Sequence, residues 1–351
     1  MAAAMITGLG LVSSHGQGRA VHAALLDGAT PILDAARFAP HTIHPTPALP
    51  LGEAIPRREF RQMEGWQRLG VYGAGLAIDD AGRRDRVANM DLTIAAGGGE
   101  RDTALDERVL AARPDDAGTH RMLMDGLRPT LFLAQLSNLL AGSISIVHGV
   151  GGSSRTLLGE EIAGAEALRV AALRVESGRS SLALTGAALV PERAELLLLY
   201  ALGDQLLRAP WTPLPGRRGF ALGAAAAFLT LEPEGAAAAP LARLTRVLTD
   251  QGAEAGRRAR LAALIATAGG EDAMLISTAS GAPAATADEL SALPRTPDLF
   301  TSDLVGHSVE AAFPFGVAMG ALAIAAGRAR RVLVTGTGQW RGEAVALLEA
   351  P

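Results

Sequence analysis

One pattern occurs twice in this chain and constrains its fold more than any other feature. It spans residues 164–187, GAEALRVAALRVESGRSSLALTGA, and residues 316–337, GVAMGALAIAAGRARRVLVTGT. Each copy has a helical stretch of small residues, then Gly-Arg, then an apolar run that leads into Thr-Gly. Glycine often follows the last turn of a helix, because it adopts the left-handed backbone conformation without strain. A helix followed by a strand, present in two copies, predicts a duplicated α/β unit for the 351 residues.

Short apolar runs that end in small residues recur along the chain, and helical segments separate them. The predicted strands lie at 4–10, 92–99, 182–190, 224–232, 274–281 and 331–338, and helical periodicity marks 64–82 and 162–178. Strands that alternate with helices indicate an α/β protein with largely buried sheets. Only 4% of the residues are aromatic although 49% are hydrophobic, so we expect a core built from Ala, Leu, Val and Gly.

The absence of lysine and cysteine excludes several kinds of chemistry. All 32 basic residues are arginine, which removes lysine Schiff bases and the lysine of a phosphate-binding P-loop. Cysteine is absent, so disulfides, thiolate metal sites and a cysteine nucleophile are excluded. The net charge of −4, with arginines spread along the chain, gives no electrostatic reason to expect a nucleic acid partner. We expect neither a metal nor a cofactor.

Two glycine-rich stretches and one apolar stretch have functional alternatives. Gly8-Leu9-Gly10 follows a strand, but the third glycine of a dinucleotide fingerprint falls on Ser13, and residues 97–99 fit a strand-end turn. Residues 311–327 carry no charge, yet their Ala and Gly content and Pro314 disfavour insertion, so we predict a buried helix and no membrane span. The N-terminus lacks the basic segment of a signal peptide, and a cytoplasmic location is expected.

Four segments carry a resemblance to one family, in the family's order. They are ITGLGLVSSHGQG at 6–18, NLLAGSISIVHGVGG at 138–152, RRGFALGAAAAFLTLE at 217–232 and DLVGHSVEAAF at 303–313. They resemble VTGxGxVSxxGxG, NxAAGxx(S/A)IxxGLxG, DGFVxGEGAAVLVLE and KSxxGHxxGAAG of the β-ketoacyl synthases. The resemblance implies an α/β, thiolase-like duplicated αβαβα layered fold, with an N-terminal half at 1–233 and a C-terminal half at 234–351.

The same resemblance identifies the positions of the family's catalytic residues, which are a cysteine at a strand-to-helix elbow, two histidines and a lysine. The helix N-terminus lowers the pKa of such a thiol and offers N–H groups to an oxyanion. The ungapped alignment from residue 138 places the cysteine position on Glu161. Ser280 takes the place of the first histidine and Ser302 that of the lysine, while His307 is retained. The catalytic set is therefore incomplete.

Other positions would shape the acyl pocket. The family's NSFGFGGxNAxLVL, whose phenylalanine gates that pocket, falls on TGTGQWRGEAVALL from residue 335. Gln339 takes the gate position, and Trp340 lies beside it. By the same resemblance, the segment at 127–138, LRPTLFLAQLSN, would line an acyl tunnel through Phe132, Leu133 and Leu136.

Each catalytic position also has a plain structural interpretation. Glu161 can cap its helix, or it can plug the emptied site, because a carboxylate at a helix N-terminus satisfies free N–H groups. His307 can be a buried histidine inherited from the fold, or it can retain a function. Ser280 and Ser302 are expected to be filler rather than serine nucleophiles, since nothing in the sequence places a base beside either one.

Three functional hypotheses follow. Family members that lack the nucleophile resemble chain-length factors, inactive subunits that form a heterodimer with an active ketosynthase, shape its acyl tunnel and meet an acyl carrier protein. That resemblance implies type II polyketide, aryl-polyene or fatty-acid-like biosynthesis. The second hypothesis is an atypical acyltransferase, malonyl decarboxylase or hydrolase that uses Glu161 and His307 as an acid/base pair. The third is a homodimeric scaffold that binds acyl carriers.

Overall fold

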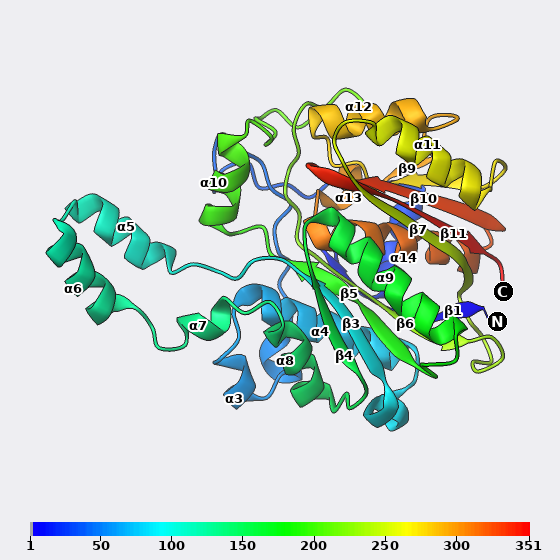
Figure 1. Cartoon of the computed structure of the whole chain (residues 1–351), viewed down its shortest axis with the longest axis horizontal. Helices are drawn as coiled ribbons and strands as arrows, with labels where there is room; N and C mark the ends of the chain where they lie inside the picture. The colour runs from blue at the N-terminus through cyan, green and yellow to red at the C-terminus, as the bar shows by residue number, and fades with distance from the viewer. Residues whose placement is uncertain (1–2) are drawn as a thin grey trace.

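A computed structural model describes residues 3–351, in which two layers of strands alternate with three layers of helices (Figure 1). In chain order the strands are β1 Ala4–Ser13, β2 Gly16–Gln17, β3 Asp91–Ala96, β4 Ser154–Leu158, β5 Ala183–Leu189, β6 Ala225–Pro233, β7 Ala242–Ala253, β8 Met274–Ser277, β9 Leu299–Phe300, β10 Arg331–Thr337 and β11 Arg341–Glu349. Their spatial order is β4-β3-β5-β6-β1 followed by β7-β11-β10-β8-β9, and β2 pairs with β1.

Most of the helices belong to the three helical layers. They are α1 Arg19–Ala24, α2 Leu51–Ala54, α3 Arg57–Phe60, α4 Gly65–Asp80, α5 Thr103–Ala112, α6 Asp116–Gly126, α7 Leu131–Ala134, α8 Leu139–His148, α9 Glu161–Glu176, α10 Ala194–Leu202, α11 Arg257–Ala268, α12 Pro283–Ala292, α13 Thr301–Val305 and α14 Ala312–Ala325, with 3-10 turns η1 Leu25–Asp27, η2 Arg84–Asn89 and η3 Val309–Ala311. Helices α9 and α14 contact each other between the two sets of strands. Helices α4 and α8 cover one outer face, and α11 and α12 cover the other. This is the predicted αβαβα order.

The repeated sequence pattern corresponds to equivalent elements. Helix α9 leads into β5 and helix α14 leads into β10, so the two copies place one helix each in the central layer and one strand in each sheet. Gly178 and Gly327 follow the two helices with φ of 71° and 69°. Only glycine adopts this left-handed conformation freely, which explains the shared Gly-Arg stop.

The two sets of strands meet at one place. Residues 4–6 at the start of β1 pair with residues 242–244 at the start of β7, so the path of strands is continuous. Strands up to Pro233 lie on one side of this junction, and strands from Ala242 lie on the other. The boundary between halves at 233 and 234 stays a prediction.

The glycines of the first strand allow a helix to pack closely. A Cβ atom on Gly10 would lie 1.9 Å from the carbonyl oxygen of Gly73 in α4. The Gly-Leu-Gly sequence at 8–10 therefore serves the contact between β1 and α4. The apolar stretch at 311–327 contains the buried helix α14, as predicted. Within residues 3–351, no helix combines the length and apolarity that a membrane span requires.

One excursion was not predicted from the sequence. After β3 the chain leaves the body, and α5 and α6 project from it as an arm before α7 and α8 return (Figure 1). Leu105 of α5 packs over Gly126 of α6, where a Cβ would lie 2.6 Å from the leucine side chain. The outer faces of the arm remain in solvent, with Leu110 and Met124 among its exposed apolar side chains.

Candidate functional site

Glu161 lies at the strand-to-helix elbow that the sequence predicts. Strand β4 ends at Leu158, Gly159 and Glu160 turn the chain, and Glu161 is the first residue of α9. The side chain is 7% exposed, and it belongs to the layer of helices enclosed by the two sets of strands. The predicted strand-to-helix elbow is therefore present, and a carboxylate occupies it.

The Glu161 carboxylate is bound from two sides. His307 Nε2 lies 2.9 Å from its Oε1, and the backbone N–H of Gln339 donates to its Oε2 at 3.3 Å. Because an ionised carboxylate only accepts, the first bond requires the proton on Nε2. His307 is 1% exposed and packs edge-to-face against Phe220, with ring centroids 5.0 Å apart. The pair is fixed inside the protein.

One detail of the sequence interpretation is wrong. A carboxylate at this position was expected to satisfy the free N–H groups of its own helix, but neither Glu160 nor Glu161 makes a side-chain cap to α9. The carboxylate instead accepts from Gln339, on the loop between β10 and β11. Geometry explains the difference, because the side chain of a first-turn residue here points toward His307 and that loop.

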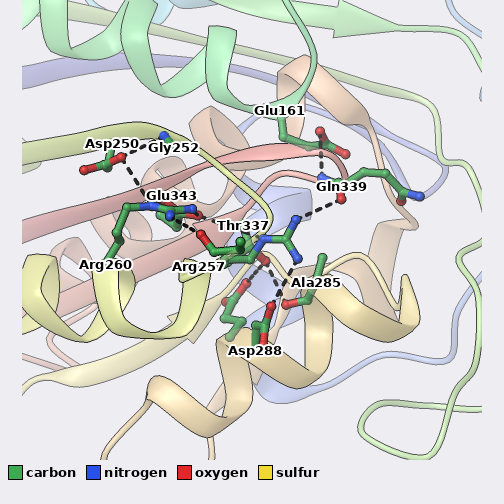
Figure 2. A network of polar contacts seen from close by, with 12 residues as sticks. Glu161, Asp250, Gly252, Arg257, Arg260, Ala285, Asp288, Thr337, Gln339 and Glu343 are labelled. Atoms are coloured by element: carbon green, nitrogen blue, oxygen red, sulfur yellow. Dashed lines mark hydrogen bonds and ion pairs between the residues drawn. The ribbon is translucent and has the colours of Figure 1, made fainter.

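A buried arginine holds the loop that carries Gln339 (Figure 2). Arg257, wholly buried at the start of α11, donates to the Gln339 carbonyl oxygen at 3.0 Å and to Asp288 at 3.2 Å. Its Nε lies 3.9 Å from Glu343, which Arg260 binds through two nitrogens at 2.7 and 2.9 Å. The network fixes the gate position from behind.

The two serines at catalytic positions belong to a separate cluster. Arg217 donates to the Ser280 carbonyl oxygen at 3.2 Å, to Ser302 Oγ at 2.9 Å and to Asp303 at 3.0 Å. Ser302 Oγ donates to the Ala279 carbonyl oxygen at 2.6 Å. Both serines are buried, and within residues 3–351 neither bonds to His307 or to Glu161. The structure therefore gathers Glu161, His307 and Gln339, and it keeps the serines apart from them.

The candidate tunnel residues lie away from this centre. Phe132 in α7 is 68% exposed, and Leu133 and Leu136 are half-buried. None of the three lies in the wall of either cavity next to Glu160 and Glu161. Their tunnel-lining role stays a prediction, and it would require a second subunit to cover them.

Two cavities of very different volume lie at Glu161 and beside it; we call the Glu161, His307 and Gln339 cluster the closed centre. The cavity beside Glu161 measures about 10 Å³, which is at the lower limit for a single water molecule. A larger cavity of about 600 Å³ lies next to it and includes Glu160, Tyr200, Glu310 and Trp340 in its wall. Trp340, 45% exposed, stacks on Tyr200 with ring centroids 5.7 Å apart and an interplanar angle of 13°.

Comparison with known protein families gives one assignment. The sequence model described as "Beta-ketoacyl synthase, N-terminal domain" matches residues 45–237, more than half of the chain. The chain belongs to the β-ketoacyl synthase family. No curated protein matches it.

Solved structures place this β-ketoacyl synthase family member in the thiolase-like fold. The ishigamide ketosynthase/chain length factor superimposes with a TM-score of 0.83 at 21% identity, covering 100% of this chain and 99% of that chain. A β-ketoacyl synthase from Burkholderia phymatum gives 0.81 at 15% identity, and both chains are covered completely. A type II PKS acyl-carrier protein in complex with its ketosynthase gives 0.78 at 15% identity, again with complete coverage. At these identities the likeness establishes the fold.

The sequence analysis did not predict one residue of the site. Glu310 falls on the glycine of the family pattern GHxxGAAG, and its carboxyl is buried in the wall of the larger cavity. Burial raises the pKa of Glu310 to about 8, and the nearby charge of Glu161 adds to that shift. An acid in place of a motif glycine was the available indication, beside the retained His307.

Proposed function

We propose that this chain is a non-catalytic, chain-length-factor-like subunit that pairs with an active ketosynthase and helps to shape its acyl tunnel. The closed centre carries the proposal: the Glu161 carboxylate is bound by His307 and Gln339 in a space of about 10 Å³. An acyl group has no room there, and the position offers no thiol. Ser280 and Ser302 further remove the histidine and the lysine that would stabilise developing charge.

An open sheet edge supports a partner subunit. Strand β4 ends the path of strands, pairs only with β3 within residues 3–351, and is largely exposed. A strand in this position presents unpaired backbone groups to another chain. Twelve large hydrophobic side chains are exposed within residues 3–351. Six of them lie in residues 103–158, on the arm, α7, α8 and β4. A covering subunit would remove such exposed apolar side chains from solvent.

The similar structures support the choice of partners. One is described as a ketosynthase/chain length factor, and another is an acyl-carrier protein in complex with its ketosynthase. We carry both partners over to this chain as a proposal, with type II polyketide, aryl-polyene or fatty-acid-like synthesis as the pathway class.

Co-expression with a cysteine-containing synthase encoded beside this chain tests the proposal. We expect a stable heterodimer in size-exclusion chromatography with light scattering, and no turnover of acyl thioesters by this chain alone. Glu161→Ala should leave product formation by the pair largely intact. Failure to pair, together with thioester turnover by the isolated chain, would contradict the proposal.

The hydrogen bond between Glu161 and His307 favours a second candidate, an acid/base enzyme acting on acyl thioesters. The pair is positioned for proton transfer, but the small adjacent cavity gives a substrate no access to it. Hydrolysis or decarboxylation of malonyl-N-acetylcysteamine by the isolated chain, abolished by Glu161→Gln, would establish this function instead.

A further inference from the structure

The larger cavity beside the closed centre has the wall of a binding site for an apolar molecule. Its volume of about 600 Å³ lies within the range of small-molecule sites. Rings and leucines make up much of the wall, namely Trp66, Leu189, Leu196, Leu199, Tyr200 and Trp340. The cavity lies where β3, β4 and β5 end, between α10 and η3, so elements from distant parts of the sequence build it.

One carboxyl group in this wall accepts a hydrogen bond only from its own backbone N–H. Glu310 is 6% exposed, and within residues 3–351 no other residue donates a hydrogen bond to its carboxyl or forms an ion pair with it. The carboxyl extends over Gly97, where a Cβ atom would lie 2.4 Å from its Oε1. The missing side chain at residue 97 therefore makes the space for this group.

The charges that face Glu310 have partners of their own. On α9, Glu161 is bound to His307 and Gln339, and Glu160 pairs with Arg341 at 3.2 Å. Beside α10, Arg193 binds Glu195 at 2.8 Å and the carbonyl oxygens of residues 98 and 99. The charge of Arg193 acts on Glu310 from a distance, but within the described chain no cation forms an ion pair with the Glu310 carboxyl.

The surroundings keep two groups of the cavity wall uncharged. Burial raises the pKa of Glu310 to about 8, so the carboxyl carries its proton at neutral pH. Burial also raises the pKa of Tyr200 above its usual range, and the charges of Glu161 and Glu310 add to that shift. A neutral carboxylic acid and a phenol are both O–H donors, a combination suited to a carbonyl oxygen.

We infer that this cavity binds a neutral carbonyl compound with an apolar chain, and that Glu310 donates a hydrogen bond to the carbonyl oxygen. The rings and leucines hold the chain, and Tyr200 offers a second donor in the same wall. A carboxylate ligand would meet the acidic Glu160 and Glu195 in this wall, whereas Arg101 and Arg193 are already paired with Asp106 and Glu195. This inference concerns the isolated chain, and it holds or fails independently of the pairing with a ketosynthase.

Three probes of equal chain length test the inference: 2-octanone, octanoate and octylammonium. Titration calorimetry and the fluorescence of Trp66 and Trp340, both in the cavity wall, report binding to the full chain. At pH 7 we expect 2-octanone to bind more tightly than either ion. Its affinity should fall at least fivefold by pH 9.5, because an ionised Glu310 can no longer donate.

Substitutions at residue 310 separate donation from volume. Glu310→Gln keeps an N–H donor, so 2-octanone should bind within about twofold of the original at pH 7 and lose its pH dependence. Glu310→Leu should weaken binding about five- to tenfold, the effect of one lost hydrogen bond. Near-ultraviolet circular dichroism and thermal melting show whether each variant is folded.

A second pair of variants tests the geometry without removing the acid. Gly97→Ala should displace the carboxyl and weaken 2-octanone binding, whereas Gly98→Ala, with open space at its Cβ position, should retain it. The inference is overturned if folded Glu310→Leu binds 2-octanone as well as the original does. It is also overturned if octylammonium binds most tightly with an affinity that rises with pH, or if the two glycine variants behave alike.

Discussion

At the scale of single residues, a buried acid is the main feature of the candidate site. Glu161 lies at the strand-to-helix elbow and accepts one hydrogen bond from His307 and another from the Gln339 backbone. These two donors would be buried without partners if the site were empty. The acid therefore has a structural effect whatever its chemical role.

Truncation of this acid should destabilise the protein. Glu161→Ala leaves the His307 and Gln339 donors buried and unpaired, at about 1–3 kcal/mol each. Glu161→Gln keeps one acceptor oxygen, so its free energy of unfolding should fall clearly less. Urea denaturation at pH 7 measures both variants. Equal stability of Glu161→Ala and the original chain would show that the two bonds contribute nothing.

Two buried histidines should make the protein sensitive to mild acid. Burial lowers the pKa of His22 to about 4 and that of His44 to about 3, whereas unfolded histidine titrates near 6.5. The unfolded chain thus binds more protons in this window, and stability falls as pH drops from 6.5 toward 4. The slope is at most about 1.4 kcal/mol per pH unit for each histidine.

A substitution isolates one of these contributions. His44→Leu should reduce the dependence of unfolding free energy on pH between 6.5 and 4 by the share of one proton. The exposed His120 is the matched control, and His120→Gln should leave the slope unchanged. Parallel curves for His44→Leu and the original chain would contradict the assignment. Urea titrations at half-unit pH intervals provide the comparison.

At the scale of elements, the loop between β10 and β11 depends on a helix from elsewhere in the sequence. Arg257 of α11 donates a hydrogen bond to the Gln339 carbonyl oxygen. The backbone N–H of Gln339 in turn donates to Glu161 (Figure 2). Glu161, the predicted gate residue Gln339 and α11 are thus linked through the backbone N–H and C=O of one residue.

Removal of this anchor should loosen the loop. Arg257→Met leaves the Gln339 carbonyl and Asp288 without the hydrogen bonds of Arg257, and we expect a loss of about 3 kcal/mol in the free energy of unfolding. Trp340 fluorescence should change as well, because its stacking on Tyr200 depends on the same loop. The exposed neighbour gives the control, and Arg258→Met should cost less than about 0.5 kcal/mol. A large loss of stability without any change at Trp340 would place the effect outside the loop.

The elements themselves were predictable to different degrees. The repeated pattern at 164–187 and 316–337 marks the two central helices and the strands after them, because small residues, a glycine stop and an apolar run are local features. The arm of α5 and α6 was not predicted, since its outer face is apolar at Leu110 and Met124 without a partner in the chain. Strand β11 was also missed, because GEAVALLE is rich in residues that favour helices.

For the site, the sequence could indicate the location of single residues but not their contacts. The gap-free segment from residue 138 placed Glu161 at the elbow, and the retained Gly-His placed His307 in the fold. Their 2.9 Å contact could not be predicted, because it joins residues 146 positions apart. Glu310 and Arg257 were missed for a related reason. Their importance comes from neighbours that only the packed structure brings together.

At the scale of the whole molecule, the open edge at β4 is where we propose that a second subunit binds. Leu158 ends this strand and is 69% exposed, next to the turn that leads to Glu161. Exposure of an apolar side chain at the end of an edge strand costs free energy, and a covering subunit would remove that cost.

A charge at this position should prevent pairing without unfolding the chain. Leu158→Glu should abolish the heterodimer with the neighbouring ketosynthase, as measured by light scattering, and should change the melting temperature of the isolated chain little. Ile32→Glu, at an exposed apolar residue in a distant loop, should pair normally. Normal pairing of Leu158→Glu would move the interface away from the β4 edge.

The β4 edge also has a consequence for the amounts in which this chain and its proposed partner are synthesised. A strand with unpaired backbone groups accepts any other extended segment, including the same strand of a second copy. Copies produced in excess of the covering subunit would therefore capture one another. The recoverable amount of this protein should follow the ratio in which the two subunits are synthesised, and a stronger promoter for this chain alone should increase the insoluble fraction.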